Sequence, residues 1–487
     1  MRRCVLALLP WLWVVACASP APTFDLVIEG GRVLDPETGL DGVRSVGARG
    51  DTISVVSTER LQGTRTIDAS GLVVAPGFID LHDHGQSLEA YRLMALDGVT
   101  TALELEIGVP EIRRFIDVRR GRSPIHFGAT ASYLGARVLA WNMPLPQSIL
   151  GLEAGVIPPS GPATNDPASP ERLQRILAAL RSQIEAGALG VGVGLEYAPG
   201  ATRHEVIEVF RLAATLGVPV FVHVRSGGLV EPGSSIEAIN EVIGAAAISG
   251  AALHIVHLNS TCMSDSRECL SMIAGARSRG LDVTTEAYPY TAGMTLINSA
   301  LFNPGWRVRR GLSYGDLELP ESGERLTRER FEALHAAPEP RLVLIHTNPE
   351  KLVDSVMADP LVIVASDGLM DHPRGAGTHA RVLARYVRDQ KTIPLSDAIR
   401  KMSLMPAQRL EKATSEAKRL GRLQQGARAD IVVFDPQTVQ DHATFRAPTE
   451  ASVGVRYLIV AGTVVIEEGH VRDGIAPGQP LMGNARP

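Results

Sequence analysis

The sequence predicts an α/β protein: a (β/α)8 TIM-type barrel with a small composite β-sandwich domain built from both chain ends. Through the middle of the chain, short apolar runs alternate with helix-like segments, which is typical of a parallel barrel. Near both ends the runs are short, β-branched and punctuated by glycine, which favours strands without helices. A chain of 487 residues with 45% hydrophobic content can form both parts.

The N-terminal residues have the pattern of an export signal. Two arginines precede an apolar run from Val5 to Ala16, which is short for a membrane span. Val14-Val15-Ala16-Cys17 is typical of a bacterial lipoprotein cleavage box, so residues 1–17 are predicted to be a lipoprotein-type signal peptide and Cys17 the lipidated residue. An ordinary signal peptide cleaved near Ala18, or an uncleaved anchor, is the alternative. We expect an exported, periplasmic protein, attached to the outer membrane only through an N-terminal lipid anchor.

Charge and cysteine content exclude other classes. A net charge of −5 and a pI near 6.2 give no basic surface for nucleic acid. Beyond the leader the chain has only Cys262 and Cys269, which excludes a disulfide framework. These two cysteines could pair in an oxidising compartment or remain buried thiols.

The composite β domain is predicted from residues 23–75 and 417–478. Asp25 to Asp35 alternates and breaks at a Gly-Gly pair, as two strands with a tight turn would. Further short strands are expected on both sides of the barrel, at residues 45–46, 52–57, 66–67, 429–435, 455–460 and 463–467. Because β segments of the same texture flank a long middle, we expect one composite sandwich built from both ends.

The barrel is predicted over residues 76–416. Its expected strands are Phe78–Leu81, Thr100–Glu106, His126–Ser132, Gly190–Leu195, Val218–Val224, Ala252–Leu258, Asp282–Ala287 and Leu361–Ala365, with a shorter candidate at Arg341–His346. Helices are expected at Pro170–Ala186, His204–Thr215 and Ile236–Ile248. The charged, irregular segment Pro304–Ala337 is predicted to be a lid or insertion near the active face.

A metal site is predicted where the strands end. His82 and His84 follow the first strand, and side chains two residues apart share a face of a strand. His223, His257 and Asp367 each close or follow a later strand, at the same end of the barrel. Four imidazoles and a carboxylate suit one or two Zn²⁺ ions, although other divalent metals are possible.

Two metals need a bridging anion, and the chain has no lysine before Lys351 that could be carboxylated for that purpose. Glu104 and Glu106 share a face of the second strand, and a buried carboxylate is costly unless it meets a cation. Glu106, nearer the strand end, is the preferred bridge and Glu104 the second choice; both could instead face solvent or pair with arginines. Glu196 is a weaker candidate.

Two further histidines are predicted to be structural. His254 lies three residues before His257, so strand alternation places the two on opposite faces, with His254 packed under the helices. His126 begins the third strand, where a packing or rim position is expected.

These motifs, in this order, resemble the amidohydrolase superfamily and, within it, the D-aminoacylases (N-acyl-D-amino-acid deacylases). The resemblance covers nearly the whole chain beyond the leader. It is carried by Pro76-Gly77-Phe78-Ile79-Asp80 with His82 and His84, Gly98-Val99-Thr100-Thr101, Gly194 to Gly200, His223-Val224-Arg225, Tyr288 to Gly293, Ser366-Asp367-Gly368, His372-Pro373-Arg374-Gly375, Gly377-Thr378, Pro406-Ala407 and Gly421-Arg422-Leu423.

The chain departs from the D-aminoacylase pattern at three places. The family's metal-binding cysteine after the second strand is absent, and Ile107 and Gly108 stand near that position. Asn259 replaces a lysine that often follows the sixth-strand histidine, and Met294 stands where a serine is expected, beside Thr295. The metal chemistry can survive these changes, whereas the substrate cannot be carried over from the family.

The resemblance implies hydrolysis of a small-molecule linear amide by a metal-bound hydroxide. Asp367 is expected to be catalytic, accepting a proton from water and returning it to the leaving amine. Arg225 and Arg374 are candidate clamps for a substrate carboxylate, or else form internal ion pairs. Tyr197 and Tyr288 are candidate donors to the oxyanion, or else pack at the rim.

The first hypothesis is therefore a metal-dependent hydrolase acting on non-peptide amide bonds of N-acyl-D-amino acids or on peptides that contain D residues. A cyclic-amide hydrolase of the dihydroorotase or hydantoinase type is the nearby alternative. A non-catalytic binding lipoprotein on the same barrel is the third, but a binding protein has no need of all four histidines and Asp367 together.

Overall fold

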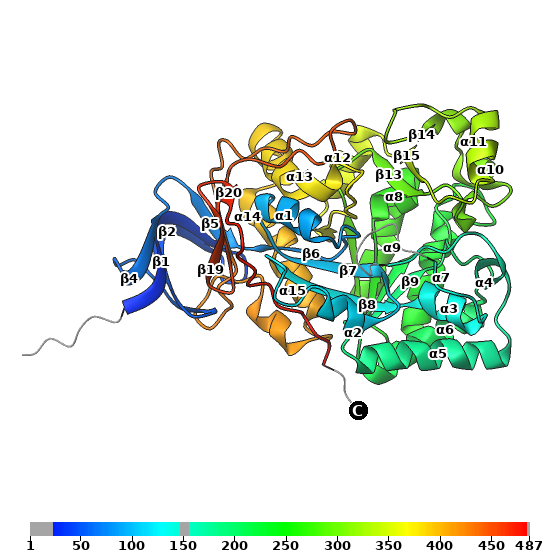
Figure 1. Cartoon of the computed structure of the whole chain (residues 1–487), viewed down its shortest axis with the longest axis horizontal. Helices are drawn as coiled ribbons and strands as arrows, with labels where there is room; N and C mark the ends of the chain where they lie inside the picture. Colours follow the sequence, from blue (N-terminus) through cyan, green and yellow to red (C-terminus); the bar gives the residue numbers. More distant parts are fainter. Residues whose placement is uncertain (1–22, 147–154, 485–487) are drawn as a thin grey trace, which may run out of the picture.

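The structure is a computed structural model that describes residues 23–146 and 155–484. The predicted signal peptide and its lipidation site Cys17 lie outside the described residues. Figure 1 shows a β-rich domain at the left end, the barrel and its helices across the middle and right, and the insertion at the upper right. Within the described ranges, no helix has the length and apolar character needed to cross a membrane.

Eight parallel strands form the barrel sheet, in the order β16-β12-β11-β10-β9-β8-β7-β6. The barrel closes just past its outer strands, where the His84 amide donates to the Gly368 carbonyl at 2.9 Å. The predicted (β/α)8 barrel is confirmed. Its strands are β6 (Phe78–Asp80), β7 (Val99–Val109), β8 (His126–Ser132), β9 (Val191–Gly194), β10 (Val220–His223), β11 (Leu253–Ile255), β12 (Val283–Ala287) and β16 (Val362–Val364).

Helices surround this sheet because each carries one apolar face. In α5 (Pro170–Glu185), Leu173, Ile176, Leu180 and Ile184 are buried at helical spacing, and the Ser169 hydroxyl caps the first turn. The other helices around the barrel are α1 (Leu88–Leu96), α2 (Ile112–Asp117), α3 (Tyr133–Ala140), α4 (Pro162–Asn165), α6 (Arg203–Leu216), α7 (Ser235–Ser249), α8 (Leu258–Cys262), α9 (Ser266–Ser278), α12 (Glu350–Ala358), α13 (Arg374–Arg381), α14 (Leu395–Met402) and α15 (Leu404–Leu410).

Strands from both chain ends hydrogen-bond into one nine-stranded sheet, in the order β20-β19-β18-β17-β5-β1-β2-β3 with β4 beside β1. The two ends meet where Val432 of β17 pairs with Ala75 of β5. Ile28 and Ile459 share a core with other apolar residues from both ends, so neither part buries its strands alone. The strands are β1 (Thr23–Asp35), β2 (Leu40–Arg49), β3 (Thr52–Ser57), β4 (Gln62–Asp68), β5 (Val73–Pro76), β17 (Ile431–Phe434), β18 (Val455–Val460), β19 (Thr463–Glu467) and β20 (His470–Val471).

An insertion between β12 and β16 has a small antiparallel sheet of its own, in the order β13-β15-β14. Its strands are β13 (Ala292–Leu296), β14 (Leu317–Glu318) and β15 (Leu342–His346), and its helices are α10 (Trp306–Arg310) and α11 (Arg328–His335). The candidate barrel strand at Arg341–His346 is therefore wrong: this segment pairs antiparallel with β13, so it does not join the barrel.

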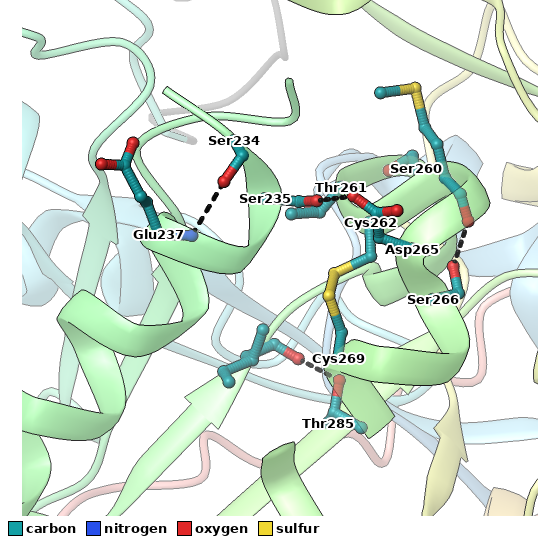
Figure 2. Close-up of a disulfide and its surroundings, with 12 residues drawn as sticks. Ser234, Ser235, Glu237, Ser260, Thr261, Cys262, Asp265, Ser266, Cys269 and Thr285 are labelled. Atoms are coloured by element: carbon teal, nitrogen blue, oxygen red, sulfur yellow. Dashed lines mark hydrogen bonds between the residues drawn. A yellow bond between two sulfur atoms is a disulfide. The ribbon is translucent and has the colours of Figure 1, made fainter. Parts of the chain in front are cut away.

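The two cysteines form a disulfide. Cys262 ends α8 and Cys269 lies in α9, and both are fully buried. Figure 2 shows the bond joining the two helices directly after Ser260 and Thr261. It fastens the segment that immediately follows the candidate ligand His257.

Candidate metal centre and active site

His82 and His84 lie just past β6, a strand that packs closely against β7. A Cβ atom on Gly77, before the strand, would lie 2.2 Å from the Thr100 side chain, so only glycine allows β6 to pack on β7 there. The Nε2 atoms of the two histidines lie 3.1 Å apart. Both imidazoles therefore aim at one point, as their spacing predicts.

Glu106 joins two buried groups of possible ligands. One group is His82, His84, Glu106 and Asp367, and the other is Glu106, His223 and His257; within each group the ligand atoms lie within 4.8 Å of one another. Glu106 Oε2 is 3.0 Å from His82 Nε2, while Oε1 is 2.5 Å from His223 Nδ1 and 3.1 Å from His257 Nε2. One carboxylate thus faces both groups, which is the arrangement expected of a bridge.

Glu104 is not grouped with these ligand atoms. Its Oε2 lies 2.6 Å from Nδ1 of His84, and its Oε1 accepts from the Ile107 and Gly108 amides. Glu104 was the second choice for the bridge, and these contacts place its carboxylate behind His84, whereas Glu106 lies among the donor atoms. Glu104 holds the His84 ring by the nitrogen opposite Nε2.

His254 lies inside the barrel and not under the helices, which corrects the prediction. Strand β11 ends at Ile255, and His257 adopts a left-handed backbone conformation with φ of 31°. This breaks the alternation and turns both rings inward. His254 Nε2 lies 2.9 Å from Glu286 Oε2.

Glu286 is a residue of the site that the sequence reasoning missed. Its Oε1 lies 2.5 Å from Nδ1 of His82, so it holds that ring as Glu104 holds His84. Burial raises the pKa of Glu286, but the charges of His82 and His254 outweigh burial and lower it to about 2. A glutamate within the otherwise uncharged strand 283–287 was the available signal.

Asp367 follows β16 in a left-handed conformation, with φ of 52°. Its Oδ1 lies 3.4 Å from His82 Nε2 and 3.3 Å from His84 Nε2, and its Oδ2 lies 2.8 Å from the Arg374 guanidinium. Burial raises the pKa of Asp367, but Arg374 and His82 outweigh that effect and hold it below its usual range. The carboxylate is therefore ionised beside the donor atoms.

Arg374 is fully buried, and its guanidinium lies 4.7 Å from the centre of the Tyr288 ring. The described residues that line the cavity do not include it. The Arg225 guanidinium donates to Glu241 through two contacts of 2.7 and 2.8 Å. Arg225 is also absent from the described cavity lining. Arg225 therefore forms the internal ion pair that was the alternative to a substrate clamp.

A cavity of about 570 Å³ opens above the donor atoms. His84, Glu106, His223, His257 and Asp367 lie in its wall. Tyr197 and Tyr288 also line it; the Tyr197 hydroxyl bonds to Thr295, and burial raises the pKa of both tyrosines. The apolar part of the lining includes Val156, Ile157, Met294, Leu296, Leu301, Leu342, Ile345 and Leu369.

Glu196 lies behind His223. Its Oε2 is 2.9 Å from His223 Nε2, and its Oε1 is 3.4 Å from Arg310 Nη1. Burial lowers the pKa of His223, but the bond to Glu106 outweighs burial and raises it to about 9. His126 is remote from these groups, since it bonds to Asp430 at 3.1 Å and to the Gln479 amide.

The residues present fit a metal centre. Burial of this many imidazoles and carboxylates is costly unless a cation balances them, and their nitrogen and oxygen atoms are the ligands that zinc prefers. Carboxylates hold two of the imidazoles from behind, as is usual for metal-bound histidine.

A sequence profile of the amidohydrolase family matches residues 65–134 and 163–466. The chain belongs to this family. It is 31% identical to an N-acyl-D-glutamate deacylase of Alcaligenes xylosoxydans xylosoxydans, over 91% of this chain and 94% of that protein. It is 30% identical to a D-aminoacylase of the same organism, over 92% and 96%.

Solved structures agree with the family assignment. A crystal structure of N-acyl-D-glutamate deacylase from Bordetella bronchiseptica, complexed with zinc and a phosphonate mimic of the tetrahedral intermediate, has a TM-score of 0.79 and 25% identity. The match covers 95% of this chain and all of that one. A D-aminoacylase crystal structure has a TM-score of 0.78 with the same identity and coverage.

Proposed function

We propose that this amidohydrolase is a metal-dependent deacylase of N-acyl-D-amino acids that uses one or two zinc ions. The observation that carries the proposal is the position of Glu106, between two buried groups of imidazoles at the base of a cavity that can hold a small molecule. The relatives named above, two of them deacylases of N-acyl-D-amino acids at 30% identity or more, support this substrate class.

The residues that would hold the metal are His82, His84 and Asp367 on one side of Glu106, and His223 and His257 on the other. When bound, zinc supplies Lewis acidity that activates water and polarises an amide carbonyl. Glu104 and Glu286 keep the rings of His84 and His82 oriented. A displacement of either imidazole ring by about 1 Å would disturb the positions of the metal-binding nitrogens and lower activity.

Asp367 is the proton carrier in this proposal. Its Oδ1 faces the donor atoms, whereas its Oδ2 is held by Arg374, so one oxygen is free to act on substrate and water. The ionised carboxylate accepts a proton from the attacking water and delivers it to the departing amine nitrogen. Arg374 therefore positions Asp367 in addition to any contact with substrate.

Tyr197 and Tyr288 are proposed to donate to the oxygen of the tetrahedral intermediate. Both rings lie in the cavity wall, and Tyr197 packs on His223 with ring centres 4.9 Å apart. Because burial raises the pKa of each hydroxyl, both keep their protons at neutral pH and remain donors.

The test is an assay of amine release from N-acetyl-D-amino acids and their L enantiomers, with ring opening of dihydroorotate and hydantoin measured in parallel. We expect release from the D enantiomers that chelation stops and zinc restores. Ring opening without amine release would instead favour the cyclic-amide hydrolase, and binding without either reaction would favour the non-catalytic lipoprotein.

We also propose that the protein is exported and lipidated at Cys17. The leader sequence supports this, and so does the buried disulfide between Cys262 and Cys269, since disulfides persist mainly in oxidising compartments. Metabolic labelling with a radioactive fatty acid tests the proposal: the full chain should take up label, and Cys17→Ala should not. Equal labelling of both would refute Cys17 as the site.

A further inference from the structure

The imidazole of His257 is oriented by a hydroxyl group. Its Nε2 lies 3.1 Å from Glu106 Oε1 and 3.1 Å from His223 Nδ1, so Nε2 is the nitrogen that faces the other candidate ligands. Its Nδ1 points the other way and lies 3.1 Å from the Thr261 hydroxyl. When Nε2 of a histidine binds a metal ion, Nδ1 carries the proton and needs an acceptor. The Thr261 hydroxyl is in the position of that acceptor.

This hydroxyl distinguishes His257 from the other candidate ligand imidazoles. Each of those bonds to a carboxylate through its remaining nitrogen, at 2.5 to 2.9 Å: His82 to Glu286, His84 to Glu104 and His223 to Glu196. A neutral hydroxyl is a weaker acceptor than a carboxylate. The orientation of His257 therefore depends closely on where the backbone places Thr261.

Thr261 lies on α8, a helix of five residues. The residues on either side of this helix, His257 and Met263, have left-handed backbone conformations with φ of 31° and 43°. A helix of this length is not stable by itself, and such conformations of residues other than glycine persist only where the surrounding structure enforces them. Contacts from outside α8 must therefore hold Thr261 in place.

The disulfide provides one such contact. Cys262 directly follows Thr261, and its bond joins the end of α8 to Cys269 in α9 (Figure 2). The turn between the two helices is also tied to α7, because the Ser235 hydroxyl lies 3.1 Å from the Asp265 carboxylate. Thr261 and both cysteines are buried. The disulfide thus fixes the residue next to the hydroxyl that orients the imidazole.

We infer that Thr261 is a positioning residue for metal binding beside His223 and His257, and that the Cys262–Cys269 disulfide acts on the metal site through it. The inference rests on the proposed function, which places metal at these two histidines. Without the hydroxyl, a buried N–H group has no acceptor and the imidazole becomes a weaker ligand. Without the disulfide, the hydroxyl is no longer held against the ring.

The first test measures zinc affinity by competition with a chromophoric chelator, well below the melting temperature. Thr261→Val keeps the shape of the side chain but removes the acceptor, so it should lower the affinity for the zinc beside His257 about 10-fold. Thr261→Ser keeps the hydroxyl and should bind zinc nearly as tightly as the wild type. Ser266→Ala is the matched control: it removes a buried hydroxyl that bonds to the Met263 carbonyl at 2.7 Å, and it should leave zinc affinity unchanged.

The second test is a double-mutant cycle. Removing the disulfide with Cys262→Ala/Cys269→Ala should lower the same zinc affinity when Thr261 is present, and should cost no further affinity in Thr261→Val. A general loosening of the fold would instead lower affinity by the same factor in both backgrounds. Equal losses in both backgrounds, or no loss in either, would overturn the role assigned to the disulfide.

Unchanged zinc affinity in Thr261→Val would overturn the inference as a whole, and this includes the case in which zinc binds only beside His82. Release of amine from N-acyl-D-amino acids by the same wild-type preparation would leave the proposed function standing in that event. A wild type that neither binds zinc nor releases amine would overturn the proposed function together with the inference.

Discussion

Glu286 holds His82 by the nitrogen that faces away from the other ligands: Oε1 of Glu286 lies 2.5 Å from Nδ1, while Nε2 of the ring lies 3.0 Å from Glu106. The other oxygen of Glu286 bonds to His254. The barrel interior therefore supports the donor atoms with a buried layer of charged and polar groups.

Removing the Glu286 charge should weaken metal binding. Glu286→Gln should lower zinc affinity about 10- to 100-fold, because the amide orients His82 less firmly and makes it a weaker ligand. Competition with a chromophoric chelator measures this. Glu318 is a buried carboxylate of the insertion that pairs with Arg325 and with Arg446 from the C-terminal part of the chain, so Glu318→Gln is the control and should retain wild-type affinity.

Asp367→Asn should slow turnover severely and leave the metal bound. The amide cannot accept a proton, so kcat should fall by roughly 10² to 10⁴, whereas Glu106 and the imidazoles still hold zinc. Steady-state kinetics and metal analysis of the same preparation check both statements. The nearby Asp371→Asn should change neither, and near-normal activity of Asp367→Asn would remove Asp367 from the mechanism.

Asp282 should stabilise the fold in a pH-dependent way. It lies 2.8 Å from the buried Arg409 and 2.6 Å from Lys412. Burial raises the pKa of Asp282, but these cations outweigh burial and lower it below the unfolded value. The stabilisation is therefore present above about pH 4 and is lost as pH falls through the folded pKa.

Urea unfolding of wild type and Asp282→Asn tests this. At pH 7 the variant should lose about 1 kcal/mol of unfolding free energy, a modest value because Asp282 is 35% exposed and partly screened. The difference should shrink towards pH 3. A difference that stays constant or grows on acidification would contradict the assignment.

The disulfide should stabilise the segment that follows His257. It closes a short loop, for which about 2 kcal/mol is expected. A reductant should therefore lower the melting temperature of the wild type. Cys262→Ala/Cys269→Ala should melt at one temperature with or without reductant, and a reductant effect of equal size in this variant would show that the disulfide is not its source.

Much of the barrel could be predicted because strand periodicity and glycine turns are local properties. His126–Ser132 matches β8 residue for residue, and the expected positions of His82, His84 and His223 follow from strand ends. The position of His254 could not be predicted, since it depends on the left-handed backbone at His257. Neither could the pairing of Arg225 with Glu241, which lies one helix further along the chain.

The place of Arg341–His346 in the fold also could not be predicted from the local sequence pattern. Its apolar residues suit a barrel strand and an antiparallel insertion equally well, and only pairing with β13 decides between them. Glu286 was overlooked for a related reason: a glutamate in a strand is informative only once His82 is known to lie opposite it.

Diffraction data collected at the zinc edge from zinc-loaded crystals would test the central claim most directly. We predict an anomalous peak beside Glu106, among His82, His84 and Asp367. Where the second site is filled, we predict another peak on the other side of Glu106, beside His223 and His257. Zinc bound elsewhere, with no peak at Glu106 in a preparation that cleaves N-acyl-D-amino acids, would contradict the account.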